Sequence, residues 1–135
     1  MNLEPWPGRY AFGIDEIDDQ HRALFEFIAK LEAAIPTSES WIVVQQTLND
    51  LSYWARVHFS VEESLMRLIR FPELESHIAM HADFMKKIAK LKKQALRKDI
   101  ARDTSRFLND WLRHHIDVDD RKYAEHFLAH FRIGA

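Results

Sequence analysis

The chain contains no cysteine, and only three glycines and four prolines occur among its 135 residues. The lack of cysteine excludes disulfides, thiolate metal sites, cysteine nucleophiles and iron–sulfur clusters. The longest apolar run, Trp41 to Val44, is far too short to cross a bilayer. The N-terminal region has no apolar stretch of signal-peptide length. We therefore expect a cytoplasmic protein that does not insert into membranes.

An excess of charge of one sign is also lacking. The chain has 19 basic and 21 acidic residues, which gives a formal net charge of −2. This balance argues against a protein that binds nucleic acid by neutralising phosphates. With 47% hydrophobic and 30% charged residues, the composition suits one soluble domain over residues 1–135. What the chain has in unusual number is histidine, with eight residues.

The few helix-breaking residues divide the chain into long segments with helical patterns. Pro36 and Pro72 mark two of the turns between these segments. The predicted helices cover about residues 15–35, 41–69, 73–97 and 101–116, with a short fifth helix over about 120–131. The residues before the first helix predict an N-terminal arm. The pattern predicts an all-α fold, an up-down-up-down four-helix bundle with this arm and a short C-terminal helix.

Each of the four long helices has an apolar stripe that should face the other three. A helix turns about 100° per residue, so the position of every histidine relative to its stripe can be predicted. Glu62 lies on the second stripe. His114 lies about 90° from the centre of the fourth stripe and should be peripheral. The histidines that fall on a stripe are His21, His58, His77, His81 and His115.

Five imidazoles and a carboxylate that converge inside one bundle predict a metal site. Burial of these groups without partners would be costly, most of all for the carboxylate. Two pairs, His58 with Glu62 and His77 with His81, have the (i, i+4) spacing that places side chains next to each other. One zinc ion takes about four ligands, so this set is too large for it. The set fits two ions, and imidazole with bridging carboxylate suits iron.

The same residues form motifs that resemble those of the hemerythrins, in particular the single-domain bacterial hemerythrins. The resemblance runs from about Trp6 to Tyr123, nearly the whole chain. Its motifs are Gly13-Ile14-Asp15-x-Ile17-Asp18-x-Gln20-His21, His58-Phe59-x-x-Glu62-Glu63-x-x-Met66, Phe71-Pro72 leading to His77-x-x-x-His81-x-x-Phe84, and Trp111-Leu112-x-x-His115-Ile116-x-x-x-Asp120-x-x-Tyr123.

This resemblance implies two iron ions joined by an oxo or hydroxo bridge. The implied ligands of one iron are His77, His81 and His115. The implied ligands of the other iron are His21 and His58. The implied bridging carboxylates are Glu62 and Asp120. All seven positions carry the expected residue type.

Asp120 is the ligand that helical periodicity does not predict. It follows His115 by five residues, which places the two side chains about 140° apart on a regular α-helix. If Asp120 is the bridging residue, the fourth helix must distort or end between Ile116 and Asp120. Asp117 and Asp119 are neighbouring alternatives, and the family spacing favours Asp120.

The resemblance also implies the function. Two six-coordinate irons offer twelve positions, and the imidazoles, the bridging carboxylates and the shared oxygen fill eleven. The open position lies on the iron with two histidines. There the family binds dioxygen reversibly, end-on and as hydroperoxide, for oxygen storage, delivery or sensing. The residues that would line the dioxygen pocket are Leu24, Phe59, Trp111, Leu112 and Ile116.

Two other classes of function share this metal chemistry. The first is a diiron enzyme, such as an oxidase, a peroxidase or a protein that handles nitric oxide. The second is an iron or zinc store. Ferritin-like diiron oxidases use Glu-x-x-His pairs and about four carboxylates. No Glu-x-x-His occurs in this chain, so we expect no enzyme. The sequence leaves open the protein client, the oxygen affinity, the physiological role and the oligomeric state.

Overall fold

The structure, a computed structural model, describes residues 13–132. The described residues form helices that are joined by short turns. These helices are α1 (Asp15–Ala34), α2 (Ser40–Leu68), α3 (Leu74–Ala95), α4 (Ala101–Trp111), the π-helix η2 (Leu112–Asp120) and α5 (Arg121–Arg132). The predicted N-terminal arm lies outside the described residues.

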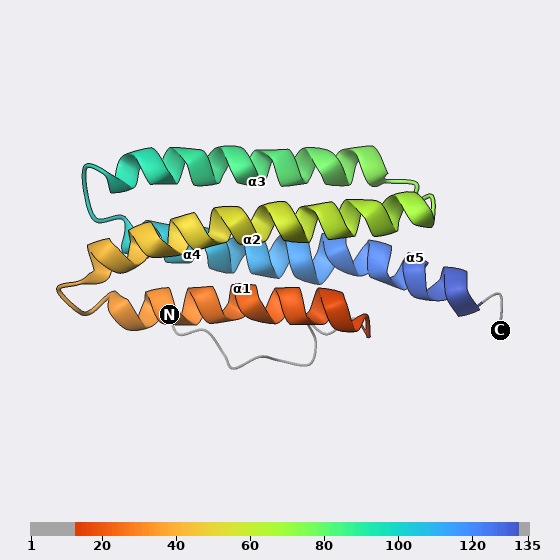
Figure 1. The fold of residues 1–135 in the computed structure, drawn as a ribbon, viewed down its shortest axis with the longest axis horizontal. Coiled ribbons are helices and arrows are strands. Elements are labelled where there is room, and N and C mark those ends of the chain that lie inside the picture. The colour runs from red at the N-terminus through yellow and green to blue at the C-terminus, as the bar shows by residue number, and fades with distance from the viewer. Residues whose placement is uncertain (1–12, 133–135) are drawn as a thin grey trace.

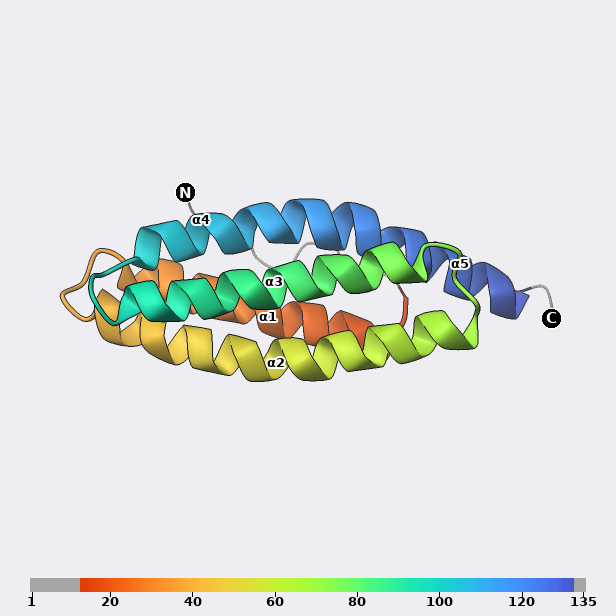
Figure 2. The ribbon, with the colours of Figure 1, turned by 90° about the horizontal axis from the view of Figure 1, so that it is seen from above.

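The helices form an antiparallel bundle in which each long helix runs opposite to the one before it (Figure 1). α2 packs between α1 and α3, and α4 closes the bundle against α1 and α2. The two views place α2 and α4 at opposite corners (Figure 2). This arrangement confirms the predicted all-α up-down-up-down bundle. The predicted fifth helix is not separate, because α4, η2 and α5 follow one another without a turn.

The helix boundaries follow local signals in the sequence. α1 begins with Asp15 and Glu16, whose negative charges interact favourably with the positive end of the helix dipole. After α2, Arg70 adopts a left-handed backbone with φ of 52°, which turns the chain toward α3. The backbone N–H of Phe71 then donates to the carbonyl of Met66 at 2.9 Å, so the helix end is capped.

Each helix buries one apolar face, and the outward faces carry most of the charged side chains. α3 shows this pattern clearly, since Ile88 and Leu91 are buried whereas Lys86, Lys90 and Lys93 are exposed. None of the helices within residues 13–132 combines the length and the apolar character that a membrane span requires.

Two apolar clusters fill the interior, one on each side of the buried histidines. The larger cluster occupies the bundle from Leu31 and Val44 to Leu24 and Phe59. The smaller cluster consists of Met66, Ile69, Phe71 and Tyr123. On α2, Phe59 of the larger cluster and Met66 of the smaller cluster lie on either side of Glu62. The site is therefore enclosed by apolar side chains at both ends.

Candidate metal centre

The structure brings together all seven side chains that the sequence singled out. Their nitrogen and oxygen atoms form two groups, and within each group the candidate ligand atoms lie within 4.8 Å of one another. All seven residues are buried. The first group contains His77, His81 and His115 with Glu62 and Asp120. The second group contains His21 and His58 with the same two carboxylates.

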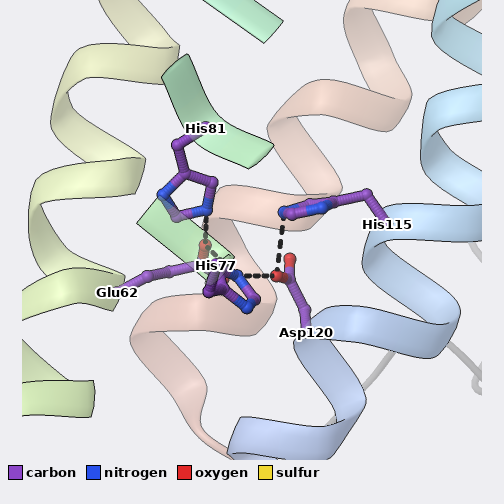
Figure 3. Close-up of side chains that lie close together, drawn as sticks. All are labelled: Glu62, His77, His81, His115 and Asp120. Atoms are coloured by element: carbon purple, nitrogen blue, oxygen red, sulfur yellow. Dashed lines mark ion pairs between the residues drawn. The ribbon is translucent and has the colours of Figure 1, made fainter. Parts of the chain in front are cut away.

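In the group with three histidines, each imidazole points its Nε2 atom at a carboxylate (Figure 3). His77 Nε2 lies 2.8 Å from Asp120 Oδ1, and His115 Nε2 lies 3.2 Å from the same oxygen. His81 Nε2 lies 3.1 Å from Glu62 Oε1. Three imidazoles from two elements, α3 and η2, therefore converge on one oxygen from each carboxylate.

The group with two histidines uses the other oxygen of each carboxylate. His58 Nε2 lies 3.2 Å from Glu62 Oε2, and His21 Nε2 lies 3.3 Å from Asp120 Oδ2. Glu62 and Asp120 thus present one oxygen to each group. This is the placement required of carboxylates that bridge two metal ions.

Many of these buried atoms have no hydrogen-bond partner. Among the described side chains, residues 13–129, no hydrogen bond reaches the Nε2 atoms of His58, His77, His81 or His115, the Oε1 atom of Glu62, or either carboxylate oxygen of Asp120. Unsatisfied buried polar atoms are costly, and they rarely cluster in a native protein. Cations placed between these imidazoles and carboxylates would satisfy them together. The donor set therefore fits metal ions.

The outer nitrogens of three imidazoles have partners that hold the rings in place. His58 Nδ1 lies 2.6 Å from Gln20 Oε1, and His81 Nδ1 lies 2.9 Å from Glu63 Oε2. His115 Nδ1 lies 3.5 Å from Oδ2 of Asp119, four residues further along the chain. A partner at Nδ1 fixes the ring orientation and leaves Nε2 for the centre of the site.

Tyr123 holds one of the carboxylates. Its hydroxyl donates a hydrogen bond of 2.8 Å to Glu62 Oε2, and both residues are fully buried. Burial, together with the Glu62 and Asp120 carboxylates, raises the pKa of Tyr123 well above its ordinary value. Tyr123 therefore stays protonated and remains a donor at any ordinary pH.

The ionisable groups of the site shift one another's pKa values. Burial lowers the pKa of His21 and His77, but the Asp120 and Glu62 carboxylates outweigh it and raise both pKa values to about 9. At His58 burial dominates and lowers the pKa. Burial favours protonated Glu62 and Asp120, but the surrounding imidazoles hold both pKa values well below the ordinary range. Both carboxylates are thus charged at neutral pH.

The π-helix η2 places Asp120 in the site. Its backbone pairs residues five apart, so His115 and Asp120 come onto the same side of the helix. The distortion that Asp120 requires therefore exists. It begins at Leu112, earlier than the predicted interval between Ile116 and Asp120. Of the alternatives, Asp117 pairs with Arg121 at 3.0 Å on the outside of the helix.

The structure also separates the two adjacent histidines of this segment. His115 is buried among the candidate ligands, whereas His114 is exposed. His114 lines a surface groove of ≈ 400 Å³ between α3 and the α4–η2 rod. The helical phase of the sequence predicts the same environments, buried for His115 and peripheral for His114.

The five residues expected around dioxygen share one apolar region. Four of them are almost fully buried, namely Leu24, Phe59, Leu112 and Ile116. Trp111 is only half-buried, because its outer side forms a wall of the groove beside α3. Its ring stacks on His115 with centroids 4.5 Å apart and lies 5.9 Å from the Phe59 ring.

Sequence reasoning gave no role to two residues that contact the candidate ligands. Gln20 and Tyr123 both lie in the matching motifs, but neither was assigned a partner. Gln20 precedes His21 and reaches across to α2, where its side chain contacts His58 and its carbonyl accepts from Trp54 Nε1 at 2.8 Å. Such contacts between helices have no periodic signal, so the motif alone could only indicate that these residues matter.

Comparison with known proteins gives the same picture. Residues 13–127 match the family described as the hemerythrin HHE cation-binding domain. A bacteriohemerythrin of Stenotrophomonas maltophilia is 34% identical over 132 residues, which are 96% of this chain and 85% of that protein. A bacteriohemerythrin of Methylococcus capsulatus is 29% identical over 126 residues, which are 91% of this chain and 95% of the other.

The fold is also found among solved structures. A wild-type hemerythrin crystal structure superposes with a TM-score of 0.83 and 26% sequence identity. The match covers 93% of this chain and 98% of that one. The sequence and the fold are thus similar to the same group of proteins over nearly their whole length.

Proposed function

Because the chain belongs to the hemerythrin family, we propose that residues 1–135 form one domain that binds dioxygen reversibly at a pair of iron ions. The observation that carries this proposal is the placement of the two carboxylates, each with one oxygen toward three histidines and the other toward two. Such a set suits two ions with imidazole and bridging carboxylate ligands.

The residues would divide between the ions as the two groups divide in space. His77, His81 and His115 would hold one iron. His21 and His58 would hold the other, and Glu62 and Asp120 would bridge. The iron pair, when bound, would supply the electrons that dioxygen takes up on binding and returns on release. The iron with two histidines has fewer protein ligands, so it is the one with room for dioxygen.

The chain's own contribution is to fix the ligands and to exclude water. Gln20, Glu63 and Asp119 hold the outer nitrogens of three imidazoles. Tyr123 holds Glu62 with its hydroxyl proton. The buried apolar side chains of Leu24, Phe59, Leu112 and Ile116, with Trp111 at their edge, would keep water and protons from the bound dioxygen.

A histidine-rich site with two carboxylates favours a carrier over an enzyme. Histidine supplies five of the seven proposed ligands, whereas diiron oxidases of the ferritin type are built on about four carboxylates. We therefore propose no catalytic residue.

Oxygenation of the reduced protein tests the function. Protein loaded with iron is reduced without oxygen and then exposed to dioxygen while absorbance is recorded. We expect a colour change that reverses when dioxygen is removed. Irreversible turnover would identify an enzyme, and the absence of any change would identify a structural or storage site.

Leu112 tests the proposed pocket. It is 1% exposed and lies one turn before His115, so Leu112→Ala should open a cavity near the dioxygen and cost roughly 2–5 kcal/mol of stability. We expect the oxygenated variant to lose its spectrum faster than the parent protein. The matched control is Leu108→Ala, a fully buried leucine one turn further away. Equal decay rates in the folded, iron-loaded parent and Leu112→Ala protein would refute a shielding role.

A further inference from the structure

The outward face of α2 differs from the exposed faces of the other helices. Among the side chains that the structure describes, those of residues 13–129, eight large hydrophobic ones are exposed, and five of them belong to α2. They are Trp41, Ile42, Tyr53, Val57 and Leu68. Tyr53 is 73% exposed and Leu68 is 65% exposed. In Figure 1, α2 lies in front of α4, so this face points away from the core.

Four of these side chains share one stripe. Ile42, Tyr53, Val57 and Leu68 are separated by 11, 4 and 11 residues (53 − 42, 57 − 53 and 68 − 57). At about 100° per residue, these steps keep all four within roughly 80° around the helix axis. We call these four residues the α2 stripe. Trp41 lies about 100° from Ile42 and is not part of it.

The residues of the α2 stripe are spaced symmetrically about Ala55. Ile42 and Leu68 are each 13 residues from Ala55, and Tyr53 and Val57 are each two residues from it. Between these residues the stripe has the exposed side chains Gln46, Asp50, Ser60 and Ser64, which pair in the same way. This symmetric spacing permits an isologous interface that pairs apolar with apolar residues, since residue i then contacts residue j of the second copy and j contacts i.

We propose that the α2 stripe is a self-association surface on which two copies of this chain pack α2 against α2, antiparallel and with the two-fold axis at Ala55. Ile42 of one copy then lies against Leu68 of the other at both ends. Tyr53 lies against Val57 on both sides of the axis. The uncharged serines at positions 60 and 64 allow the two helices to approach closely.

Charge favours the antiparallel arrangement over the parallel one. α3 packs beside α2 and has an acidic residue, Glu75, in its first turn and two lysines, Lys92 and Lys93, in its last turn. An antiparallel pair brings the acidic end of α3 toward the basic end of the partner's α3. A parallel pair would instead place α3 beside the partner's α1, whose first turn is also acidic with Asp15, Glu16 and Asp18, so like charges would meet at that end. Complementary charge of this kind sets the orientation of an interface.

The available area indicates a reversible dimer. α2 has 29 residues and is about 43 Å long, and a helix is about 10 Å wide, so the two copies would bury roughly 900 Å² along α2. Stable interfaces bury about 1,200–2,000 Å², and most crystal contacts less than about 800 Å². The dimer should therefore form and dissociate with protein concentration.

Sedimentation velocity of the iron-loaded full chain tests the proposal. From about 10 to 500 micromolar we expect the apparent mass to rise from one chain of 16.0 kDa toward two. Tyr53→Glu places two negative charges near the axis, and we expect it to raise the dissociation constant roughly tenfold or more. The matched control is Leu96→Glu, since Leu96 is 80% exposed outside the stripe. A monomer at every concentration, or equal effects of both variants, would overturn the proposal.

Cross-linking tests the register, and the chain has no native cysteine that could form other disulfides. Ile42→Cys and Leu68→Cys proteins, distinguished by mass, are mixed and oxidised. The antiparallel register predicts a disulfide between the two different variants. Disulfides formed within each variant alone, 42 to 42 and 68 to 68, would show a parallel pair and overturn the register.

The other candidate occupant of this face is the chain's own N-terminal segment, residues 1–12, which includes Leu3, Trp6 and Tyr10. Removal of residues 1–12 distinguishes the two. If the segment covered the stripe, the full chain would be a monomer and the shortened chain a dimer, and our proposal would be wrong. We expect the shortened chain and the full chain to dimerise equally, with equal sensitivity to Tyr53→Glu.

Discussion

At the scale of single residues, the site depends on how two carboxylates divide their oxygens. Glu62 and Asp120 come from different helices, yet each presents one oxygen to three histidines and the other to two. If Asp120 served one ion, its second oxygen would stay buried without a hydrogen-bond partner, which is costly. The geometry therefore favours two ions over one.

The two adjacent histidines of η2 provide a matched pair for testing the ligand set. His115 is buried beside Asp120, whereas His114 is exposed. We expect His115→Ala to lose iron and the absorption of the site. His114→Ala should keep both, because its side chain does not face the ions. Iron content and spectra of the two purified variants measure this, and the reverse result would mean that the helical register is wrong.

The pKa values of the site predict how the stability of the metal-free protein depends on pH. His21 and His77 have pKa values raised to about 9 from an ordinary value of 6.5. Their stabilisation is fully present below pH 6.5 and is lost as pH rises through about 9. Glu62 and Asp120 have lowered pKa values, so their stabilisation is lost at low pH. Burial lowers the pKa of His58, which also disfavours acid.

We therefore expect the metal-free protein, prepared by removing metal with a chelator, to be most stable near pH 6 and to lose stability by pH 9. The iron-loaded protein should show a smaller decrease over this range, because ions replace the protons that the imidazoles release. Chemical unfolding of both forms from pH 5 to 9 measures the difference. A metal-free protein that gains stability between pH 6.5 and 9 would contradict the raised histidine pKa values.

The sequence predicts which residues face the interior of the bundle where their positions follow the helical phase. Phase placed His21, His58, His77, His81 and His115 inside the bundle, and the structure agrees. It could not assign the contact of Gln20 with His58 or of Tyr123 with Glu62, since each joins two helices far apart in the chain. Such contacts depend on the packing of the bundle, which no single segment encodes.

At the scale of elements, the π-helix is the feature that periodicity could not place. The five-residue interval from His115 to Asp120 predicted a distortion, and the family spacing selected Asp120. The distortion extends over nine residues, from Leu112 to Asp120. Its onset is not visible in the sequence, because a π-helix is maintained by what its side chains contact more than by local propensity.

This dependence on the site predicts the dynamics of η2. The segment contains both His115 and Asp120, whose buried nitrogen and oxygen atoms lack hydrogen-bond partners among the described residues and would be satisfied by the proposed ions. In the metal-free protein we expect the backbone amides of η2 to exchange hydrogen faster than those in the middle of α2. Iron should slow exchange of Leu112–Asp120 roughly tenfold or more, since the ions couple η2 to α1, α2 and α3. Peptide-resolved exchange with and without iron measures this, and a change confined to other helices would contradict it.

At the scale of the whole molecule, the bundle accommodates a polar site by enclosing it between two apolar clusters. The larger cluster lies toward Leu31 and Val44, and the smaller one contains Met66, Phe71 and Tyr123. The clusters hold the four helices together on both sides of the ligands. This arrangement restricts water at the site, which would favour reversible binding over oxidation chemistry.

The measurement that tests this account most directly is the metal content of the purified protein. Cells are supplied with ample iron, and iron and zinc are determined by elemental analysis against protein concentration. The two groups of ligand atoms predict close to two irons per chain. One iron per chain, or zinc at full occupancy from the same cells, would contradict the proposed diiron centre.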